Sequence, residues 1–441
     1  MTTLFGTDGV RGRANDLLTP ELVVRIARAT AAQIAQPGAR AIIGRDTRTS
    51  GPMIEAALAS GFASAGVDVL LAGVIPTPAI SYLIKDTRAS FGAVVSASHN
   101  PPEDNGVKFF DSHGMKLSVE EEDAIEALLA GDVPPTERVG LIRPLEAAAT
   151  RYAAFLSGAI DAEAIDLSNH RIAVDCAFGA TGRIAPHVLR HLGAEVVELN
   201  VEPNGDRINV ECGSTHLEAI RAAVSEHDAD LGIAFDGDGD RVLLVAPSGR
   251  AIDGDQMLGV AALHMLRRGT LSPSTIVTTV MANLGLERTL AEHGIETVRT
   301  AVGDRNVSQE LHARGAQLGG EQSGHLVFTD HSPTGDGILT AVKLLEVAHE
   351  AEADLEALAG EIHLLPQVHG TIPSDRPSDV LEQDRVAQAI AAAKRKLGDT
   401  GRVIVRPSGT QPVIRVTVES ASAELCEEVL TDLERAISSD A

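Results

Sequence analysis

Three aspartates, Asp236, Asp238 and Asp240, alternate with glycine directly after an apolar run that is typical of a buried strand. In an extended loop, residues i, i+2 and i+4 lie on one side, so the three carboxylates should converge. They would repel one another unless a hard divalent cation such as Mg²⁺ or Ca²⁺ lay between them. An EF-hand needs glycine sixth and glutamate twelfth, where this chain has Arg241 and Pro247. The loop predicts a carboxylate metal site, with a solvated acidic turn as the alternative.

A second polar segment begins where the small apolar residues 92–95 end. Ser96 or Ser98 could be a nucleophile presented at the end of a strand, although the GxSxG elbow of serine hydrolases is absent. His99 is adjacent to Ser98 in the sequence, so its side chain would tend to point away from it. A purely structural turn is the alternative to a nucleophile.

The same segment contains two turn-forming pairs, Asn100-Pro101 and Asn105-Gly106. We expect them to fold the chain back on itself, so that Lys108 returns close to the serines.

The segment GEQSGH places Glu321, Ser323 and His325 at alternate positions, which in extended backbone would face the same way. They could contact hydroxyls of a polar ligand. The alternative is a bulged turn with a solvated glutamate.

The segment RPSGTQP, residues 406–412, lies between two expected strands. Its residues Arg406, Ser408, Gly409 and Thr410 supply a forked cation, two hydroxyls and a close backbone approach, a set that suits a phosphate. An ordinary hairpin turn is equally compatible with the spacing.

The elements that must position these residues alternate between strand and helix, which indicates βαβ units and mainly parallel sheets. This order occurs in three blocks, and a smaller α+β unit with a helix over 379–396 follows them. The predicted domains are residues 1–150, 151–252, 253–366 and 367–441. The unusual loops are expected at the carboxyl ends of parallel strands, where ligands usually bind.

The net charge of −25 argues against nonspecific binding to nucleic acid or to an anionic membrane. Few cations are available, and several lie in the polar loops: Arg11, Arg45, Arg48, Lys108, Arg241 and Arg406. This concentration favours an anionic ligand, most simply a phosphate. The chain contains no signal-like or membrane-spanning apolar run, and its three cysteines are widely spaced, so we expect a cytoplasmic protein with reduced thiols.

Taken together, the loops resemble those of the α-D-phosphohexomutase superfamily, and within it the branch that acts on glucosamine phosphates. Six segments occur in the family's order and cover nearly the whole chain: LFGTDGVRG (4–12), GRDTRTSG (44–51), SASHNP (96–101), DGDGDR (236–241), GEQSGH (320–325) and RPSGTQP (406–412). The resemblance implies three similar α/β domains with mixed, largely parallel sheets, and a C-terminal α+β domain, around a central cleft.

By motif position, the resemblance implies that Ser98 is the phosphoserine nucleophile, with His99 beside it in the active site. The metal would be one Mg²⁺ per chain, held by the Ser98 phosphate and the three aspartates. Arg11 and Lys108 would support proton transfer, and a lysine can act as the base if cationic neighbours lower its pKa.

The substrate-binding residues implied by the resemblance fall into two groups. Glu321, Ser323 and His325 would contact sugar hydroxyls, and Arg241 would also bind the substrate. Arg406, Ser408, Gly409 and Thr410 would clamp the phosphate that is not being transferred.

The implied reaction interconverts glucosamine 6-phosphate and glucosamine 1-phosphate through a sugar 1,6-bisphosphate. Glucosamine 1,6-bisphosphate or glucose 1,6-bisphosphate would be the activator, the product would feed UDP-N-acetylglucosamine and cell-wall precursor synthesis, and a homodimer is possible. The alternatives are a phosphoglucomutase or phosphomannomutase, a Mg²⁺-dependent sugar phosphatase, and a non-catalytic sugar-phosphate-binding protein. Three positions depart from the family pattern, namely Phe178, Ala282 and Gln411.

Overall fold

The computed structural model describes residues 4–6, 8–160, 165–408 and 412–438. The chain forms two compact units. The first comprises Met1–Met281 and Ile295–Gly360, and the second Ala282–Gly294 and Glu361–Ala441. The fold class is as predicted: three mixed α/β sheets precede an antiparallel sheet with helices. The domain boundaries at residues 150, 252 and 366 remain our proposed division.

The first sheet has the order β1-β5-β4-β2-β3-β6. Strands β2, β3, β4 and β6 run parallel, whereas β5 pairs antiparallel with both β4 and β1. The strands are β1 (Val10–Arg13), β2 (Arg40–Arg45), β3 (Asp68–Val74), β4 (Phe91–Val95), β5 (Asp104–Phe110) and β6 (Ile142–Pro144). The helices are α1 (Pro20–Ile34), α2 (Gly51–Ser64), α3 (Thr77–Thr87) and α4 (Val119–Leu129).

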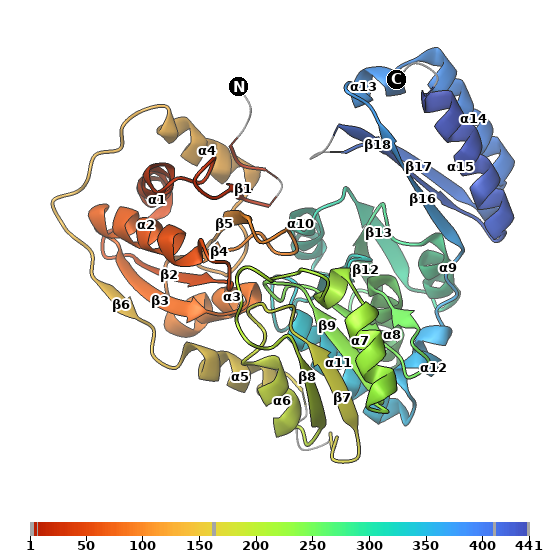
Figure 1. Ribbon diagram of the computed structural model, residues 1–441, viewed down its shortest axis with the longest axis horizontal. Coiled ribbons are helices and arrows are strands. Elements are labelled where there is room, and N and C mark those ends of the chain that lie inside the picture. Colours follow the sequence, from red (N-terminus) through yellow and green to blue (C-terminus); the bar gives the residue numbers. More distant parts are fainter. Residues whose placement is uncertain (1–3, 7, 161–164, 409–411, 439–441) are drawn as a thin grey trace. The chain divides into compact units, whose positions relative to one another are not determined.

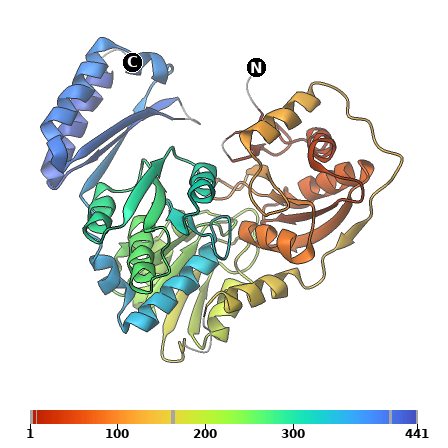
Figure 2. The same cartoon turned by 180° about the vertical axis from the view of Figure 1, so that it is seen from behind.

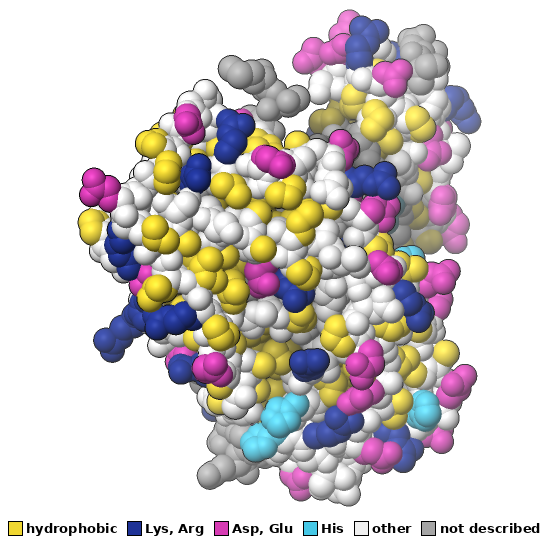
Figure 3. All heavy atoms as spheres, turned by 60° about the vertical axis from the view of Figure 1, so that its left-hand side comes forward, with side chains coloured by type: hydrophobic (Ala, Val, Ile, Leu, Met, Phe, Trp, Pro, Cys, Tyr) yellow, Lys and Arg dark blue, Asp and Glu magenta, His cyan; other side chains and the backbone are white. Residues whose placement is uncertain are grey.

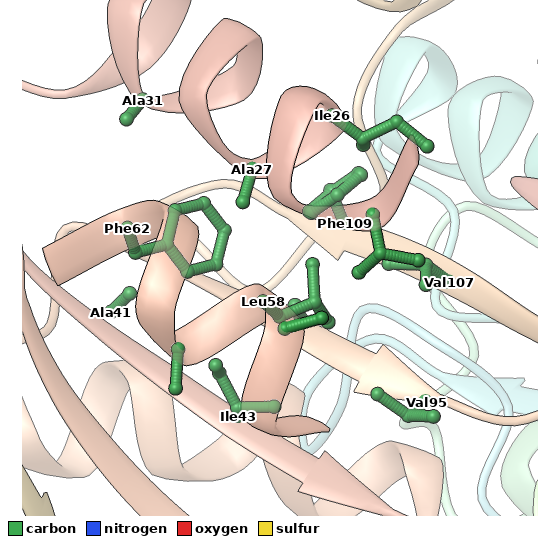
Figure 4. Packing of buried hydrophobic residues seen from close by; sticks show 14 of the residues in the cluster. Ile26, Ala27, Ala31, Ala41, Ile43, Leu58, Phe62, Val95, Val107 and Phe109 are labelled. Carbon is green, nitrogen blue, oxygen red and sulfur yellow. The ribbon is translucent and has the colours of Figure 1, made fainter. Parts of the chain in front are cut away.

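The core of this domain lies between α1, α2 and one face of the sheet, while α3 covers the other face (Figure 1). Helix α1 begins as predicted, with Thr19 as N-cap and Pro20 in the first turn. Phe62 of α2 packs against Phe91 and Phe109, with ring centroids 5.1 and 6.4 Å away. Figure 4 shows Phe62 and Phe109 among the aliphatic side chains of this cluster. This packing fixes β4 and β5, the strands on either side of the serine segment.

The expectation that Asn105-Gly106 forms a turn is wrong. Both residues lie within β5, where Gly106 is the register partner of Arg11 in β1. A Cβ at Gly106 would come within 2.5 Å of the Ser96 carbonyl oxygen, so the glycine permits close packing of the two chains. The reversal of the chain falls earlier, between Ala97 and Asp104, with Asn100-Pro101 inside it.

The second sheet has the order β11-β10-β9-β7-β8. Strands β7, β8 and β9 are parallel, and β10 runs antiparallel to β9 and β11. Its strands are β7 (Arg171–Asp175), β8 (Glu195–Leu199), β9 (Leu231–Phe235), β10 (Val242–Val245) and β11 (Ala251–Ile252). Its helices are α5 (Ala148–Gly158), α6 (Ala185–His191), η1 (Gly213–Thr215) and α7 (Glu218–Glu226).

The third sheet has the order β13-β12-β14-β15, in which only β15 is antiparallel. Its strands are β12 (Thr275–Thr279), β13 (Glu296–Thr300), β14 (Leu318–Gly320) and β15 (Leu326–Phe328). The helices are α8 (Gly254–Arg267), α10 (Asp304–Arg314), α11 (Gly337–Ala351) and α12 (Leu355–Gly360). Figure 2 shows these elements from behind, in green to light blue.

The second unit contains the antiparallel sheet β16-β18-β17 and its helices. The strands are β16 (Gln367–Pro373), β17 (Arg402–Pro407) and β18 (Val413–Glu419). The helices are α9 (Leu284–Glu292), α13 (Pro377–Leu381), α14 (Asp384–Leu397), η2 (Gly398–Thr400) and α15 (Ala423–Ser438). The helix predicted over residues 379–396 is confirmed for its larger part by α14, but its first residues belong to the separate helix α13.

Charged and hydrophobic side chains are interspersed over the face shown in Figure 3. Three exposed apolar residues, Val139, Leu141 and Ile142, lie at or just before the edge strand β6. In the described part of the chain, every helix is too short or too polar to span a bilayer.

Candidate active site

Ser98 lies just beyond the buried strand β4, in the loop that leads to β5. Its side chain is buried, and its hydroxyl donates to Asp236 Oδ2 at 2.6 Å. His99 Nδ1 lies 3.3 Å from the same hydroxyl, so the expectation that His99 points away is wrong. The loop turns sharply at Ser98, which has φ 52°, and this turn lets adjacent side chains meet. Burial, together with Arg241 and Arg11, lowers the pKa of His99 to about 3, so its imidazole is neutral at physiological pH.

Ser96 occupies a different environment from Ser98. Its hydroxyl donates to Asp46 Oδ2 at 2.6 Å and accepts the Ser98 backbone N–H at 2.8 Å. Asp46 is itself buried and paired with Arg48, whose Nε lies 2.9 Å from Oδ2. Ser96 therefore braces the loop, and Ser98 is the serine whose hydroxyl faces the aspartates.

The three aspartates of the DGDGDR loop converge, as predicted, between β9 and β10. One carboxylate oxygen from each of Asp236, Asp238 and Asp240 lies within 4.8 Å of the others, and all three residues are buried. The loop is not extended as expected: Gly239 N–H donates to the Asp236 carbonyl at 3.1 Å, in a tight turn. Gly239 has φ 72°, which favours glycine at this turn. Because all three aspartates are buried, the alternative of a solvated acidic turn is excluded.

The charge of the aspartates is only partly balanced within the protein. Burial and the two neighbouring carboxylates raise the pKa of Asp236 well above its usual range. Burial also acts to raise the pKa of Asp240, but Lys108 and His325 outweigh it and hold that pKa well below its usual range. Oδ1 of Asp238 and Oδ1 of Asp240 are buried without a hydrogen-bond donor among the described residues. This donor set fits a hard divalent cation.

Lys108 is buried beside these carboxylates. Its Nζ lies 3.3 Å from Asp238 Oδ2, 3.7 Å from Asp240 Oδ2 and 3.2 Å from Asp8 Oδ2. Its nearest charged neighbours are therefore carboxylates, so these contacts do not supply the cationic neighbours that a lysine base was expected to have. Arg11 pairs with the same oxygen of Asp8. Both cations belong to strands, β5 and β1, and not to loops after parallel strands as expected.

Asp8 also binds a second lysine that the sequence analysis did not single out. Lys116 Nζ contacts Asp8 Oδ1 and Asp304 Oδ2, the latter at the first position of α10. Burial lowers the pKa of Lys116, and the like charge of Lys108 lowers it further. Neither Asp8 nor Asp304 lies in a motif of repeated acidic residues, and their convergence depends on the packing of the first domain against the third.

The GEQSGH segment forms a tight turn between β14 and β15 rather than extended backbone. Glu321 N–H donates to the His325 carbonyl at 3.0 Å, and Gly324 N–H to the Glu321 carbonyl at 3.0 Å. Glu321 is mostly buried, with its Oε1 accepting Gly303 N–H at 3.2 Å, so the alternative of a solvated glutamate is wrong. Ser323 Oγ is buried without a hydrogen-bond partner among the described residues.

His325 brings this turn next to the aspartates. Its Nδ1 lies 3.7 Å from Asp240 Oδ2, and its Nε2 accepts Gly335 N–H at 3.1 Å. Burial acts to lower the pKa of His325, but the hydrogen bond and charge of Asp240 raise it above its usual value. Arg241 Nε lies 3.8 Å from Asp240 Oδ1. All predicted site residues from Arg11 to His325 in the sequence therefore belong to the first unit.

The residues of the predicted phosphate clamp belong to the second unit. Arg406 lies on β17 opposite Arg415 of β18, and Ser408 N–H donates to the Val413 carbonyl at 2.9 Å. Burial and the like charge of Arg415 lower the pKa of Arg406. Gly409, Thr410 and the departure Gln411 lie outside the described residues.

Two arginines expected to bind the anionic ligand have other partners. Arg45 Nε pairs with Glu55 Oε2 at 3.2 Å. Arg48 is completely buried and donates to backbone carbonyls of the serine loop, including that of Ser98 at 2.9 Å. Asn209, which the sequence analysis missed, donates to the same carbonyl at 2.8 Å. Asn209 belongs to the second domain and Ser98 to the first, so no pattern in the sequence near either residue indicated this contact.

Comparison with known proteins agrees with this arrangement. Models of the phosphoglucomutase/phosphomannomutase domains match in order: α/β/α domain I at residues 2–133, domain II at 150–249, domain III at 253–364 and the C-terminal domain at 372–436. The phosphoglucosamine mutase of Pelotomaculum thermopropionicum is 48% identical over 98% of both chains. That of Desulforudis audaxviator is 47% identical over 99% of this chain and 98% of its own.

Solved structures show the same fold. A crystal structure of a phosphoglucomutase/phosphomannomutase family protein from Burkholderia thailandensis superimposes with a TM-score of 0.85 at 27% identity, over 99% of this chain and 97% of that one. Because all four domain models match and full-length relatives are nearly half identical, the resemblance inferred from the six motifs is confirmed. The chain belongs to the α-D-phosphohexomutase superfamily, and within it to the phosphoglucosamine mutase family.

Proposed function

We infer that this chain is an isomerase that interconverts glucosamine 6-phosphate and glucosamine 1-phosphate through a phosphorylated Ser98. The observation that carries this proposal is the Ser98 hydroxyl, 2.6 Å from Asp236 in a cluster of three buried carboxylates. Ser96 is unsuited to the same role, because its hydroxyl both donates and accepts within the loop. The amino sugar is favoured because full-length relatives at 45–48% identity carry the name phosphoglucosamine mutase.

In the first step, the free hydroxyl oxygen of the sugar phosphate forms a bond to the phosphorus carried by Ser98. The bond between that phosphorus and Ser98 Oγ breaks, which gives the bound sugar 1,6-bisphosphate and an unphosphorylated Ser98. After the bisphosphate has turned round within the site, Ser98 Oγ forms a bond to the phosphorus of the other phosphoryl group. The bond between that phosphorus and its sugar oxygen breaks, and the sugar oxygen regains a proton. No phosphate is consumed, so the protein has mainly to position the groups and stabilise charge.

The sugar hydroxyl must lose a proton in the first step. Lys108 and Arg11 are proposed to support this transfer, because Asp8 pairs with both side chains and Lys108 also contacts the aspartates. Asp8 and Asp238 hold the lysine Nζ beside the carboxylates that would bind the metal. His99 is neutral, and its Nδ1 lies 3.3 Å from Ser98 Oγ. The two side chains can therefore form a hydrogen bond when Ser98 is not phosphorylated.

The metal is proposed as one Mg²⁺ per chain, held by Asp236, Asp238, Asp240 and the Ser98 phosphate. The two buried carboxylate oxygens without donors support this assignment. A divalent cation there would offset negative charge on the transferring oxygens. Without it, a phosphoserine would add about −1.5 to −2 of charge next to three carboxylates.

Substrate contacts are proposed on both units. Glu321, Ser323 and His325 would contact the sugar, and the unpartnered Ser323 hydroxyl supports this role. Arg241, whose Nε lies 3.8 Å from Asp240 Oδ1, is proposed to bind the substrate as well. Arg406, Ser408, Gly409 and Thr410 would clamp the other phosphate. Arg406 lies opposite Arg415 of β18, and two arginines at this place in the sheet support an anion-binding role.

The remaining expectations stay predictions. These are a cytoplasmic location, activation by glucosamine or glucose 1,6-bisphosphate, a possible homodimer, and no binding to nucleic acid or membrane. Phosphoglucomutase or phosphomannomutase activity is the nearest alternative, and a sugar phosphatase would instead release free phosphate.

The phosphoserine is tested by the intact mass of the purified protein before and after phosphatase treatment, and again after incubation with glucose 1,6-bisphosphate and Mg²⁺. We expect one phosphoryl group to be lost and regained, located on Ser98 by peptide mapping. A Ser98→Ala variant should gain none. Label on Ser96, or no label with full mutase activity, would contradict the proposal.

A further inference from the structure

We propose that Asn209 and Arg48 are positioning residues that hold the backbone of Ser98 in the conformation from which its hydroxyl reaches the aspartates. The inference rests on the proposed function of Ser98 as the phosphoryl carrier. It assigns to the second domain a direct part in orienting a nucleophile that belongs to the first.

The backbone of Ser98 needs such support. Its φ of 52° lies in the left-handed region, which is unfavourable for a residue with a Cβ. A conformation of this kind persists only where the surroundings over-determine it, and such positions cluster at functional sites. At Ser98 it aims the side chain at Asp236, away from the course of β4.

Arg48 supplies the first set of donors. Its Nη2 donates to the carbonyl oxygens of Ser98 at 2.9 Å and Asn100 at 2.8 Å. Its Nη1 donates to the carbonyl of Asp104 at 2.8 Å and also to that of Pro101. The guanidinium is buried, and Asp46 balances its charge at 2.9 Å. One planar side chain thereby fixes four carbonyls of the loop.

Asn209 supplies the second set from the other domain. Its Nδ2 donates to the carbonyl of Ser98 at 2.8 Å and to that of Asn100 at 3.1 Å. Each of these two carbonyls therefore accepts both Arg48 and Asn209. The backbone of Asn209 is itself left-handed, with φ 62°, and its N–H is held by the Ala177 carbonyl at 3.1 Å.

The segment that carries Asn209 is packed against the first domain. A Cβ at Gly205 would lie 2.3 Å from Thr49 N and 2.4 Å from Thr47 O, so the two backbones are in close contact. Thr47 Oγ1 donates to the Phe178 carbonyl at 2.7 Å, and Thr49 Oγ1 to Asp206 at 2.8 Å. These contacts keep Asn209 at a fixed distance from the serine loop. At Phe178, one of the departures from the family pattern, the backbone carbonyl makes the contact with Thr47, and the side chain takes no part in it.

The test compares two glycine substitutions, Asn209→Gly and Asn200→Gly. Both asparagines belong to the second domain and have left-handed backbones, with φ 62° and 51°, so glycine relieves the same strain at each. Asn200 Nδ2 donates to Asp175 at 3.0 Å rather than to the serine loop. Only Asn209→Gly therefore removes donors from the Ser98 carbonyl.

We expect kcat with glucosamine 6-phosphate to fall about tenfold in Asn209→Gly, the scale of a lost hydrogen bond to a strained group, with KM within about twofold of wild type. The rate at which glucose 1,6-bisphosphate phosphorylates Ser98, followed by intact mass, should fall by the same factor. Asn200→Gly should keep both rates. If Asn209→Gly does not fold, Asn209→Asp, which keeps the size but loses both donors, is measured in its place.

Wild-type kcat and phosphorylation rate in the Asn209 variant would overturn the proposal, as would equal losses in the Asn209 and Asn200 variants. A loss seen only as a raised KM would also overturn it, because a residue that orients Ser98 does not touch the sugar. Failure of the proposed function is a separate result, since it would show as a wild-type protein that gains no phosphoryl group on Ser98.

Discussion

Replacing Ser96 and Ser98 separately by alanine should distinguish a residue needed for stability from a residue needed for phosphoryl transfer. Ser96→Ala removes the hydroxyl that donates to Asp46 at 2.6 Å and accepts the Ser98 N–H at 2.8 Å. Both partners are buried, so each loses a bond that water cannot replace. At roughly 1–2 kcal/mol for each bond, we expect a loss of about 2–4 kcal/mol of stability. Ser98→Ala removes one hydrogen bond to Asp236, so its loss should be about half as large.

The assay pairs chemical denaturation with incorporation of a phosphoryl group from glucose 1,6-bisphosphate. Ser96→Ala should unfold at a lower denaturant concentration than Ser98→Ala, yet still be labelled at Ser98. Ser98→Ala should stay folded and gain no label. A Ser96→Ala protein that is stable but unlabelled, or a labelled Ser98→Ala protein, would refute the reasoning.

Three further predictions concern other parts of the molecule. Asp238→Asn should weaken Mg²⁺ binding and lower turnover by orders of magnitude with the fold retained; unchanged turnover at limiting Mg²⁺ would count against it. Arg406→Ala should lower kcat/KM for both sugar phosphates about ten- to hundredfold, as expected for a lost charge-assisted contact of roughly 1.5–3 kcal/mol, and wild-type kinetics would exclude the clamp. Burial raises the pKa of Asp336 to about 6, so the native state binds its proton more tightly than the unfolded chain does. The associated stability, roughly 3 kcal/mol, is present below about pH 4 and is lost as the pH rises through 6. Asp336→Asn should therefore gain stability relative to wild type over that pH interval. Parallel pH profiles of the two proteins in chemical denaturation would contradict this prediction.

The sequence was sufficient to predict that strands and helices alternate in three blocks, because each parallel strand is a short apolar run. Strands β1 and β5 were not predicted, since Arg11 and Lys108 were expected in loops. The sequence was also sufficient to predict that the three aspartates meet, since their spacing within one loop is local information. The expected backbone of that loop was nevertheless wrong, because Gly239 makes a tight turn that an alternating pattern cannot distinguish from extended chain.

Contacts between domains could not be predicted in the same way. Asn209 reaches Ser98, and Lys116 reaches Asp304, across separations of more than a hundred residues. Arg48 looked like an anion-binding arginine, but four backbone carbonyls occupy its guanidinium. A single sequence reports which residues can carry charge, whereas their partners depend on tertiary packing.

Reaction with three substrates under one set of conditions tests the proposed activity most directly. Phosphorylated wild-type protein with Mg²⁺ and a trace of glucose 1,6-bisphosphate is given glucosamine 6-phosphate, glucose 6-phosphate or mannose 6-phosphate, and the 1-phosphate products and free phosphate are quantified. We predict the highest kcat/KM for glucosamine 6-phosphate, with no net release of phosphate. A preference for glucose or mannose 6-phosphate, or stoichiometric release of free phosphate, would contradict the proposal that this protein is a mutase for glucosamine phosphates.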